Sequence, residues 1–263
     1  MNLLFTLNKK YFPQLIVLLK SIHHNNPDEE FHIYIISKEL DDNHVEEIFS
    51  NLKEAKVTIT LLEFDETLLK GSPTSKRYPL EIYYRLFAAQ VLPSDVDRIL
   101  YLDPDIVVIN SLKELYNMDF EDNYFIGATH VNKLLRKFNE IRVSAPKNAP
   151  YINTGVMMIN VKKLREEQDV NEVYEYIEKH KHKFTLPDQD VLCGLYGDKV
   201  KLINEYIYNL NDRMITIYNL KNRKKIDLDW VRENAVIIHY CGRNKPWNKK
   251  YRGILGEFYY MFE

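Results

Sequence analysis

Cysteine and glycine are both scarce in this sequence. Its two cysteines, Cys193 and Cys241, cannot form a disulfide framework, and so few thiols are typical of a protein from a reducing compartment. Only 8 of the 263 residues are glycine, and no segment is repetitive, of low complexity or rich in glycine and serine. We therefore expect residues 1–263 to form one domain rather than two domains joined by a linker.

Long hydrophobic runs are absent as well. No stretch approaches the ~20 apolar residues that a membrane-spanning helix needs. The opening residues 1–12 lack the apolar segment and the cleavage site of a signal peptide. These absences predict a cytoplasmic protein without a transmembrane segment, whose attachment to an inner membrane surface, if any, is peripheral.

Neither sign of charge dominates the composition. The 36 basic and 38 acidic residues give a net charge of −2, so no overall electric field favours nucleic acid. Basic clusters at Glu178–Lys183 and Asn219–Lys225 are more simply explained as solvated surface. We expect no nucleic-acid partner, and the sequence does not indicate an oligomeric state.

The apolar residues that are present form alternating strand and helix patterns. Strand patterns over 2–7, 31–36, 56–64 and 98–102 alternate with helix patterns over 11–26, 41–55 and 80–92. Further strands are expected near 124–129, 155–160 and 235–240, and helices near 161–167 and 188–197. This alternation predicts an α/β fold with a mostly parallel sheet, whose strands read as continuous apolar runs because helices cover both faces.

The stretch RILYLDPDIVVIN, Arg98–Asn110, places two carboxylates around a proline after an apolar strand. Pro104 has no amide hydrogen, so we expect strand pairing to stop there. In an extended chain Asp103 and Asp105 would project to the same side, beyond the carboxyl end of the strand, where open α/β sheets bind ligands.

Two carboxylates brought within ~4 Å repel each other by about 4 kcal/mol at an effective dielectric near 20. Either one is protonated or a cation offsets the repulsion, and oxygen ligands favour hard divalent ions such as Mg²⁺ or Mn²⁺. The alternative is a proline turn with two solvated aspartates, and the motif alone does not decide between them.

Five segments in order resemble glycosyltransferase family 8. They are LNKKYFPQLIVLLKSI, YLDPDIVV, YINTGVMMIN, LPDQDVLCGLYGDKVKLI and IIHYCGRNKPWNKKY. This family is retaining and metal-dependent, and it includes bacterial lipopolysaccharide galactosyl- and glucosyltransferases and glycogenin. The resemblance implies a single-domain nucleotide-sugar-binding α/β fold of the type called GT-A, with a mostly parallel central sheet flanked by helices.

The resemblance also implies a metal site and a donor site. Asp103 and Asp105 match the family's DxD pair and His239 its third metal ligand, a mixed set that suits Mn²⁺, with Mg²⁺ as an alternative. The implied nucleotide-sugar contacts include these aspartates and Leu7, Asn8, Tyr11, Arg85, Pro104, Asn153, Thr154, Gly242 and Lys245.

Several of these residues also have plainer explanations. Arg85 could be a surface side chain lying along a helix. Asn153 and Thr154 could turn the chain before a strand, and His239 could be a packed core histidine. In LPDQDVL, Pro-Asp-Gln-Asp is a good helix start whatever else it does.

The resemblance places Asp188 and Gln189 at the donor sugar and the catalytic face, with Asp190 as a further carboxylate nearby. Retention by double displacement needs a nucleophile on the far face of the sugar. Gln189 is a poor nucleophile, although Asp188 or Asp190 could substitute. We favour a front-face route, in which the departing phosphate accepts the proton of the acceptor.

The implied reaction transfers a hexose, glucose or galactose, from a UDP-sugar to a glycan or a lipid-linked acceptor. Two positions depart from the family: Asn8 stands where an acidic residue commonly reads uracil, and His130 where many members contact the donor sugar with Asp. These departures leave a non-catalytic nucleotide-sugar-binding protein as one alternative. A haloacid-dehalogenase-like phosphatase, which also uses an aspartate pair, is the other, although its pair normally follows the first strand.

Overall fold

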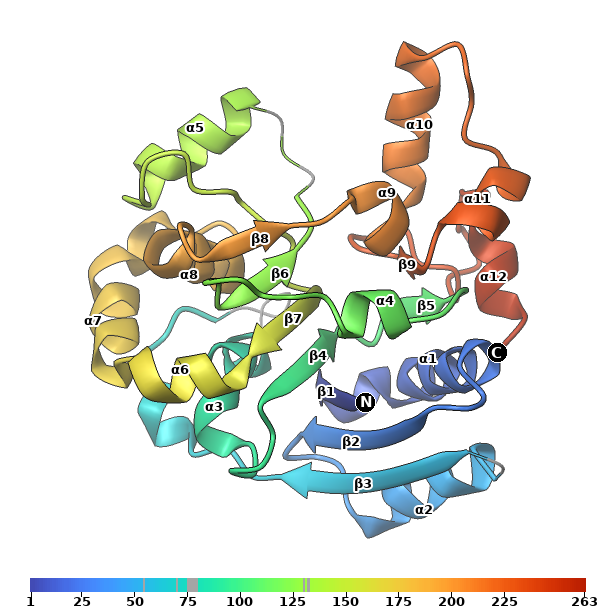
Figure 1. Ribbon diagram of the computed structural model, residues 1–263, viewed down its shortest axis with the longest axis horizontal. Coiled ribbons are helices and arrows are strands. Elements are labelled where there is room, and N and C mark those ends of the chain that lie inside the picture. Colours follow the sequence, from blue (N-terminus) through green and yellow to red (C-terminus); the bar gives the residue numbers. More distant parts are fainter. Residues whose placement is uncertain (54, 70, 75–79, 130, 132) are drawn as a thin grey trace.

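The computed structural model describes residues 1–53, 55–69, 71–74, 80–129, 131 and 133–263 (Figure 1). Within these residues the main sheet has seven strands in the order β3-β2-β1-β4-β7-β6-β8. They are β1 Asn2–Thr6, β2 Glu30–Ile36, β3 Lys56–Leu62, β4 Arg98–Leu102, β6 Phe125–Gly127, β7 Val156–Asn160 and β8 Val200–Leu202. All strands run parallel except β7, which is antiparallel to both β4 and β6, so the predicted mostly parallel sheet is confirmed.

A second, two-stranded sheet begins after the proline that was expected to end strand pairing. Strand β4 stops at Leu102, and β5, Ile106–Val108, pairs instead with the antiparallel strand β9, Ile237–His239. Pro104 therefore lies where the chain leaves one sheet for the other, because a residue without an amide hydrogen cannot continue the ladder.

Helices pack on both sides of the main sheet. The α-helices are α1 Phe12–Asn25, α2 Asp42–Asn51, α3 Ala88–Val91, α4 Lys113–Tyr116, α5 Lys133–Arg142, α6 Val161–Glu167, α7 Val170–His180, α8 Pro187–Tyr196, α9 Glu205–Tyr208, α10 Asp212–Lys221, α11 Leu228–Asn234 and α12 Gly256–Tyr260. The 3₁₀ helices are η1 Lys9–Tyr11, η2 Glu66–Leu69, η3 Leu80–Phe87 and η4 Lys181–Lys183. No helix in the described ranges has both the length and the apolar character to span a membrane.

The apolar core follows directly from the alternation of side chains along the strands. In β4, Leu100 packs in the cluster that contains α1, whereas Ile99 and Tyr101 pack on the opposite face with η3, α6, α7 and α8. Both faces of the central strands are thus buried, which is why their sequences are apolar without interruption. A third cluster lies around the second sheet and α12.

The helix expected over 80–92 is only partly correct. Residues Leu80–Phe87 form a 3₁₀ helix, and only the short α3 is α-helical. Because Tyr83, Tyr84 and Phe87 are completely buried, tertiary packing rather than helix propensity sets the backbone here. The helix expected over 41–55 ends at Asn51, and residue 54 of that range lies outside the described residues.

Candidate active site

A cavity of about 490 Å³ lies at the carboxyl edge of the central strands. Its wall contains every residue that was expected to bind metal or donor or to face the sugar, except Asp190. These residues are Leu7, Asn8, Tyr11, Arg85, Asp103, Pro104, Asp105, Asn153, Thr154, Asp188, Gln189, His239, Gly242 and Lys245. Residue 130, where His130 was expected to depart from the family, lies outside the described residues.

Strand topology explains how such distant residues meet. The strands β1 and β4 are parallel, so the residues that follow them, Asn8 and Asp103, reach the same edge of the sheet. Because β7 is antiparallel to β4, its first residue pairs with the last residue of β4, which brings Asn153 and Thr154 to that edge as well. His239 arrives from the second sheet, where it pairs with Ile106.

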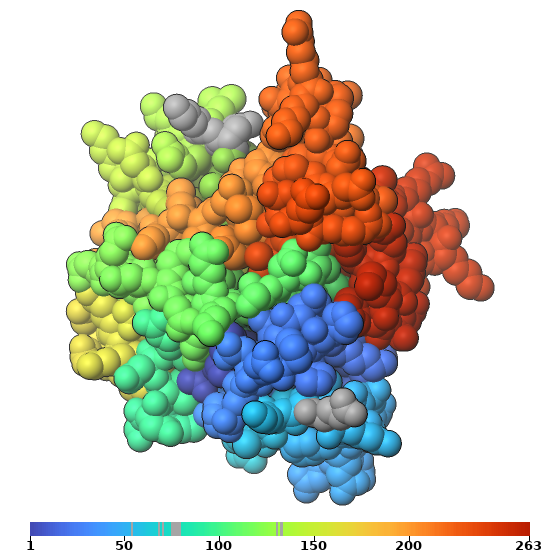
Figure 2. All heavy atoms as spheres, turned by 45° about the vertical axis from the view of Figure 1, so that its right-hand side comes forward, coloured from blue at the N-terminus to red at the C-terminus, as the bar shows by residue number. Residues whose placement is uncertain are grey.

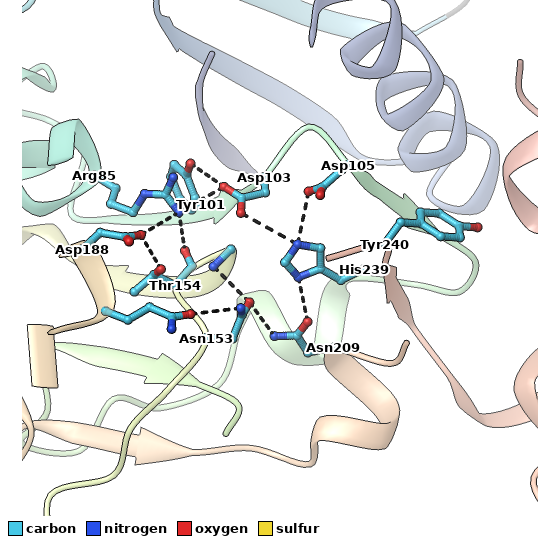
Figure 3. Close-up of polar contacts among 12 residues, drawn as sticks. Arg85, Tyr101, Asp103, Asp105, Asn153, Thr154, Asp188, Asn209, His239 and Tyr240 are labelled. Atoms are coloured by element: carbon cyan, nitrogen blue, oxygen red, sulfur yellow. Dashed lines mark hydrogen bonds and ion pairs between the residues drawn. The ribbon is translucent and has the colours of Figure 1, made fainter. Parts of the chain in front are cut away.

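Asp103, Asp105 and His239 converge on one point (Figure 3). One potential ligand atom from each lies within 4.8 Å of the other two. His239 Nε2 is 3.1 Å from Asp105 Oδ1 and 3.8 Å from Asp103 Oδ2. Burial disfavours ionisation of Asp105, yet His239 and Lys245 together hold its pKa well below the usual range. The imidazole therefore faces the acidic pair, which disagrees with the view of His239 as a merely packed histidine.

The ring orientation of His239 is fixed by a chain of amide hydrogen bonds (Figure 3). The amide N–H of Gly155, which can only donate, bonds to Asn153 Oδ1 at 3.2 Å. Asn209 Nδ2 donates to the same oxygen at 3.0 Å, so Asn209 Oδ1 lies toward His239 Nδ1, 2.9 Å away. With Nδ1–H donated to Asn209, Nε2 is the nitrogen that faces the carboxylates: it donates to Asp105 when it is protonated, and it offers a lone pair to a cation when it is not.

This donor set fits a divalent cation. Two carboxylates and an unprotonated imidazole nitrogen are ligands that Mn²⁺ and similar ions accept. The hydrogen bond behind the imidazole is the usual partner of a metal-binding histidine. Gly155 also belongs to this arrangement, because a Cβ at that position would overlap the imidazole of His239 and the carboxylate of Asp103.

Arg85 lies inside the cavity wall rather than on the surface, so the alternative of a surface side chain is wrong. It is 5% exposed and forms ion pairs with Asp103 at 3.0 Å and Asp188 at 3.5 Å. Its guanidinium stacks over the ring of Tyr101, 4.3 Å from the centroid. Although burial alone would lower it, Asp103 and its neighbours raise the pKa of Arg85, which is a permanent positive charge between two carboxylates.

The first turn of α8 brings two polar side chains to the cavity. Asp188 accepts a hydrogen bond from the hydroxyl of Thr154 at 2.5 Å, and burial raises the pKa of its carboxyl. Gln189 accepts from Asn153 Nδ2 at 3.1 Å, and its side chain also forms a hydrogen bond with Tyr151. The family resemblance implied a role for these two residues, whereas the connecting Asn209 carried no local signal.

Asp190 lies behind the cavity wall and is completely buried. Arg142 donates to both of its oxygens, at 2.5 and 2.9 Å, and Tyr151 donates to one of them at 2.7 Å. The amides of Thr185 and Leu186 complete its partners. Its carboxylate is thus engaged on all sides and does not face the space where a sugar could bind.

Another part of the cavity wall contains Lys245 and a tight turn at Gly242. Lys245 forms an ion pair with Asp105 and donates to the carbonyl of Tyr240 at 2.8 Å. Gly242 has a φ of 90°, a conformation that favours glycine, and nothing lies within 4 Å of the position of a Cβ. The edge of this wall also includes Tyr11, whose ring contacts Trp247 at a centroid separation of 6.5 Å.

Asn8 presents an unsatisfied acceptor at this wall. Its Oδ1 is buried and has no hydrogen-bond partner among the described residues. A buried oxygen without a partner costs free energy unless a ligand or water supplies a donor. Because Asn8 lines the cavity, the N–H group of a bound molecule is one source of such a donor.

An α/β sheet of this topology, with an acidic pair and a histidine at its carboxyl edge, is the architecture of GT-A glycosyltransferases. Residues 2–251 match the model of glycosyl transferase family 8, and the chain belongs to that family. It is a glycosyltransferase, so the phosphatase and non-catalytic alternatives are set aside.

Two curated relatives act on lipopolysaccharide. The chain is 28% identical to lipopolysaccharide 1,2-glucosyltransferase of Escherichia coli, over 94% of this chain and 73% of that protein. It is 24% identical to lipopolysaccharide 1,3-galactosyltransferase of Salmonella typhimurium, again over 94% of this chain and 73% of the relative. A crystal structure of galactosyltransferase LgtC with donor and acceptor sugar analogues superposes with a TM-score of 0.82 at 25% identity, covering 100% of this chain and 95% of LgtC.

Proposed function

We propose that this glycosyltransferase transfers a hexose, glucose or galactose, from a UDP-sugar to an acceptor hydroxyl with retention of anomeric configuration. The single observation that carries the proposal is the convergence of Asp103, Asp105 and His239 beside Lys245 in one cavity. The lipopolysaccharide hexosyltransferases among its relatives support the choice of sugar and of a glycan or lipid-linked acceptor.

Asp103, Asp105 and His239 would hold a divalent ion, Mn²⁺ in preference to Mg²⁺ because the set includes an imidazole. When bound there, such an ion supplies positive charge that offsets the charge developing on the departing diphosphate. Lys245 adds a second positive charge at the same wall, and Gly242 leaves space for a phosphate to approach the backbone. The leaving group is thus stabilised mainly by charges already in place.

Asn8 and Tyr11 would bind the base. The unpaired Oδ1 of Asn8 can accept a hydrogen bond from the ring N–H of uracil, and this supports UDP despite the missing acidic residue. Leu7 and Pro104 would complete the apolar part of the pocket.

The hexose would lie between Arg85, Asn153, Thr154, Asp188 and Gln189. Gln189 is a neutral amide whose oxygen accepts from Asn153, so we assign it a contact with the sugar rather than the role of nucleophile. Asp190 is fully engaged elsewhere, so we assign it a positioning role in place of the catalytic role that the sequence indicated. These contacts favour the front-face route, in which the phosphate takes the proton of the acceptor.

A UDP-release assay across several UDP-sugars, with Mn²⁺, with Mg²⁺ and with chelator, tests the proposal. We expect Mn²⁺-dependent release from UDP-glucose or UDP-galactose, and a loss of at least a hundredfold in Asp105→Asn. Asp229→Asn, at an exposed surface aspartate on α11, is the matched control and should retain full activity. Full metal-dependent activity in Asp105→Asn would show that the assigned site is wrong.

A further inference from the structure

Two helices project from the same side of the molecule and both adjoin the cavity. Figures 1 and 2 show α5 and α10 at the top, and the two views share their vertical axis. Val131, just before α5, and Arg213, in the first turn of α10, both line the cavity. The N-terminal ends of these two helices therefore adjoin the cavity, and the helices extend away from it.

Helix α5 exposes an apolar face to solvent. Leu134 is 82% exposed, Phe138 60% and Ile141 71%, and their spacing of four and three residues places them on one side of the helix. The other side is held firmly, because Asn139 is buried and Arg142 bonds to Asp190. The buried ion pair between Arg142 and Asp190 thus holds α5 with its apolar face toward solvent.

The C-terminal end of α10 combines exposed apolar side chains with exposed basic residues. Leu220 is 81% exposed and Ile217 40%, close to the exposed basic residues Lys221, Arg223 and Lys224. On α5 the exposed Lys137 lies beside Phe138. Within the described ranges none of these four cations has an acidic partner, although the whole chain has a net charge of −2.

Exposed apolar side chains next to basic residues without acidic partners fit an anionic lipid bilayer. Apolar side chains of this size enter the boundary between headgroups and acyl chains, while nearby lysine and arginine contact anionic headgroups. A nucleic acid would be bound by the cations but would leave Leu134, Phe138 and Leu220 exposed to water. A purely apolar protein partner would leave the cations without counter-charge.

We propose that α5 and the end of α10 form a docking face for an anionic phospholipid membrane. Docking in this way places the part of the cavity wall formed by Val131 and Arg213, where α5 and α10 begin, on the side of the molecule that faces the bilayer. The further consequence, delivery of a lipid-linked acceptor to that mouth, rests on the proposed function. Membrane binding itself does not depend on it.

Vesicle co-sedimentation tests the docking face. The full chain is mixed with vesicles of phosphatidylcholine alone or of equal parts phosphatidylcholine and phosphatidylglycerol. We expect binding only to the anionic vesicles, with binding that weakens as salt rises. Phe138→Ser combined with Leu220→Ser should reduce this binding at least tenfold, and Lys137→Glu with Lys224→Glu should do the same.

Phe49→Ser is the matched control, because Phe49 is 42% exposed on α2, which lies near the opposite end of the molecule (Figure 1). It should bind vesicles as the parent chain does. Each variant is also assayed for UDP release without acceptor, which should be unchanged, so that failure of docking and failure of the enzyme assignment are distinguishable. Absence of vesicle binding, or a dimer of the parent chain that Phe138→Ser with Leu220→Ser dissolves in sedimentation velocity, would overturn the proposal.

Discussion

A backbone amide sets the orientation of side chains that lie far from it in sequence. The N–H of Gly155 fixes the amide of Asn153, which fixes Asn209 on one side and Gln189 on the other. Asn209 in turn fixes the tautomer of His239. The same hydrogen bonds thus hold one ligand of the proposed metal site and the amide proposed to contact the sugar.

Replacing Asn209 with Leu should weaken metal binding without unfolding the protein. The leucine removes the acceptor behind His239, so the ring loses its fixed tautomer and orientation. Loss of such a partner typically reduces metal affinity ten- to a hundredfold. Calorimetric titration of the nucleotide-free protein with Mn²⁺ measures this directly.

The control for that titration is Asn234→Leu, at an exposed position on α11. It should leave Mn²⁺ affinity unchanged. Asn209→Asp retains an acceptor for His239 and should recover part of the affinity. Equal affinity in the parent chain and Asn209→Leu would show that the amide chain does not position the ligand.

Helix α8 illustrates how an element is positioned by a residue next to its functional one. Asp190 follows Gln189 directly and is tied to Arg142 on α5 and to the loop before α8. The ion pair therefore joins the helix that carries Gln189 to the helix that carries the exposed apolar face. Removing one partner would leave a buried, unpaired carboxylate.

Arg142→Met should destabilise this region by about 3 kcal/mol. Cys193 on α8 reports the effect, because it is 1% exposed and burial raises the pKa of its thiol to about 12. Only the thiolate reacts, so at pH 8 the native thiol is inert, and labelling requires local opening that restores an ordinary pKa. In a Cys241→Ser background we expect Arg142→Met to accelerate labelling of Cys193 at least tenfold.

Arg232→Met provides the comparison, since Arg232 is half exposed and its ion pairs are at the surface. Its labelling rate should match that of the parent chain. If Arg142→Met labels no faster than Arg232→Met, the ion pair does not hold α8 in place.

Across the whole molecule, the parts that the sequence predicted are those with local signals. Apolar periodicity located the strands as far as β4 and the helices α1 and α2, and the side chain of Asp41 caps α2. Pro104 predicted where pairing stops. Helices α7, α10 and α11 were not predicted, although the side chains of Asp169, Asn211 and Asp227 cap their first turns.

In the candidate site, too, some residues were predicted from the sequence and others were not. The paired aspartates had a signal of their own, and the resemblance to glycosyltransferase family 8 indicated the other residues of the cavity wall, because each segment matches a short family motif. Asn209, Gly155 and the engagement of Asp190 were not predictable, since each depends on a partner more than 30 residues away or on close packing in three dimensions. The role of the charge on Arg85 was likewise not predictable, because it depends on the ion pairs with Asp103 and Asp188.

The proposed metal site also joins the two sheets, because Asp103 follows β4 of the main sheet and His239 ends β9 of the second sheet. Ligands that bind across this junction should stabilise the whole fold.

At a hundred times its dissociation constant, a ligand that binds only the native state contributes about 2.7 kcal/mol to the free energy of unfolding. For a chain of this size that corresponds to a rise of about 5–10 °C in Tm. We expect UDP with Mn²⁺ to produce this rise in scanning calorimetry and excess chelator to abolish it. Asp105→Asn should show little or no shift under the same conditions, and a rise of equal size in that variant would mean that the nucleotide binds without the acidic pair.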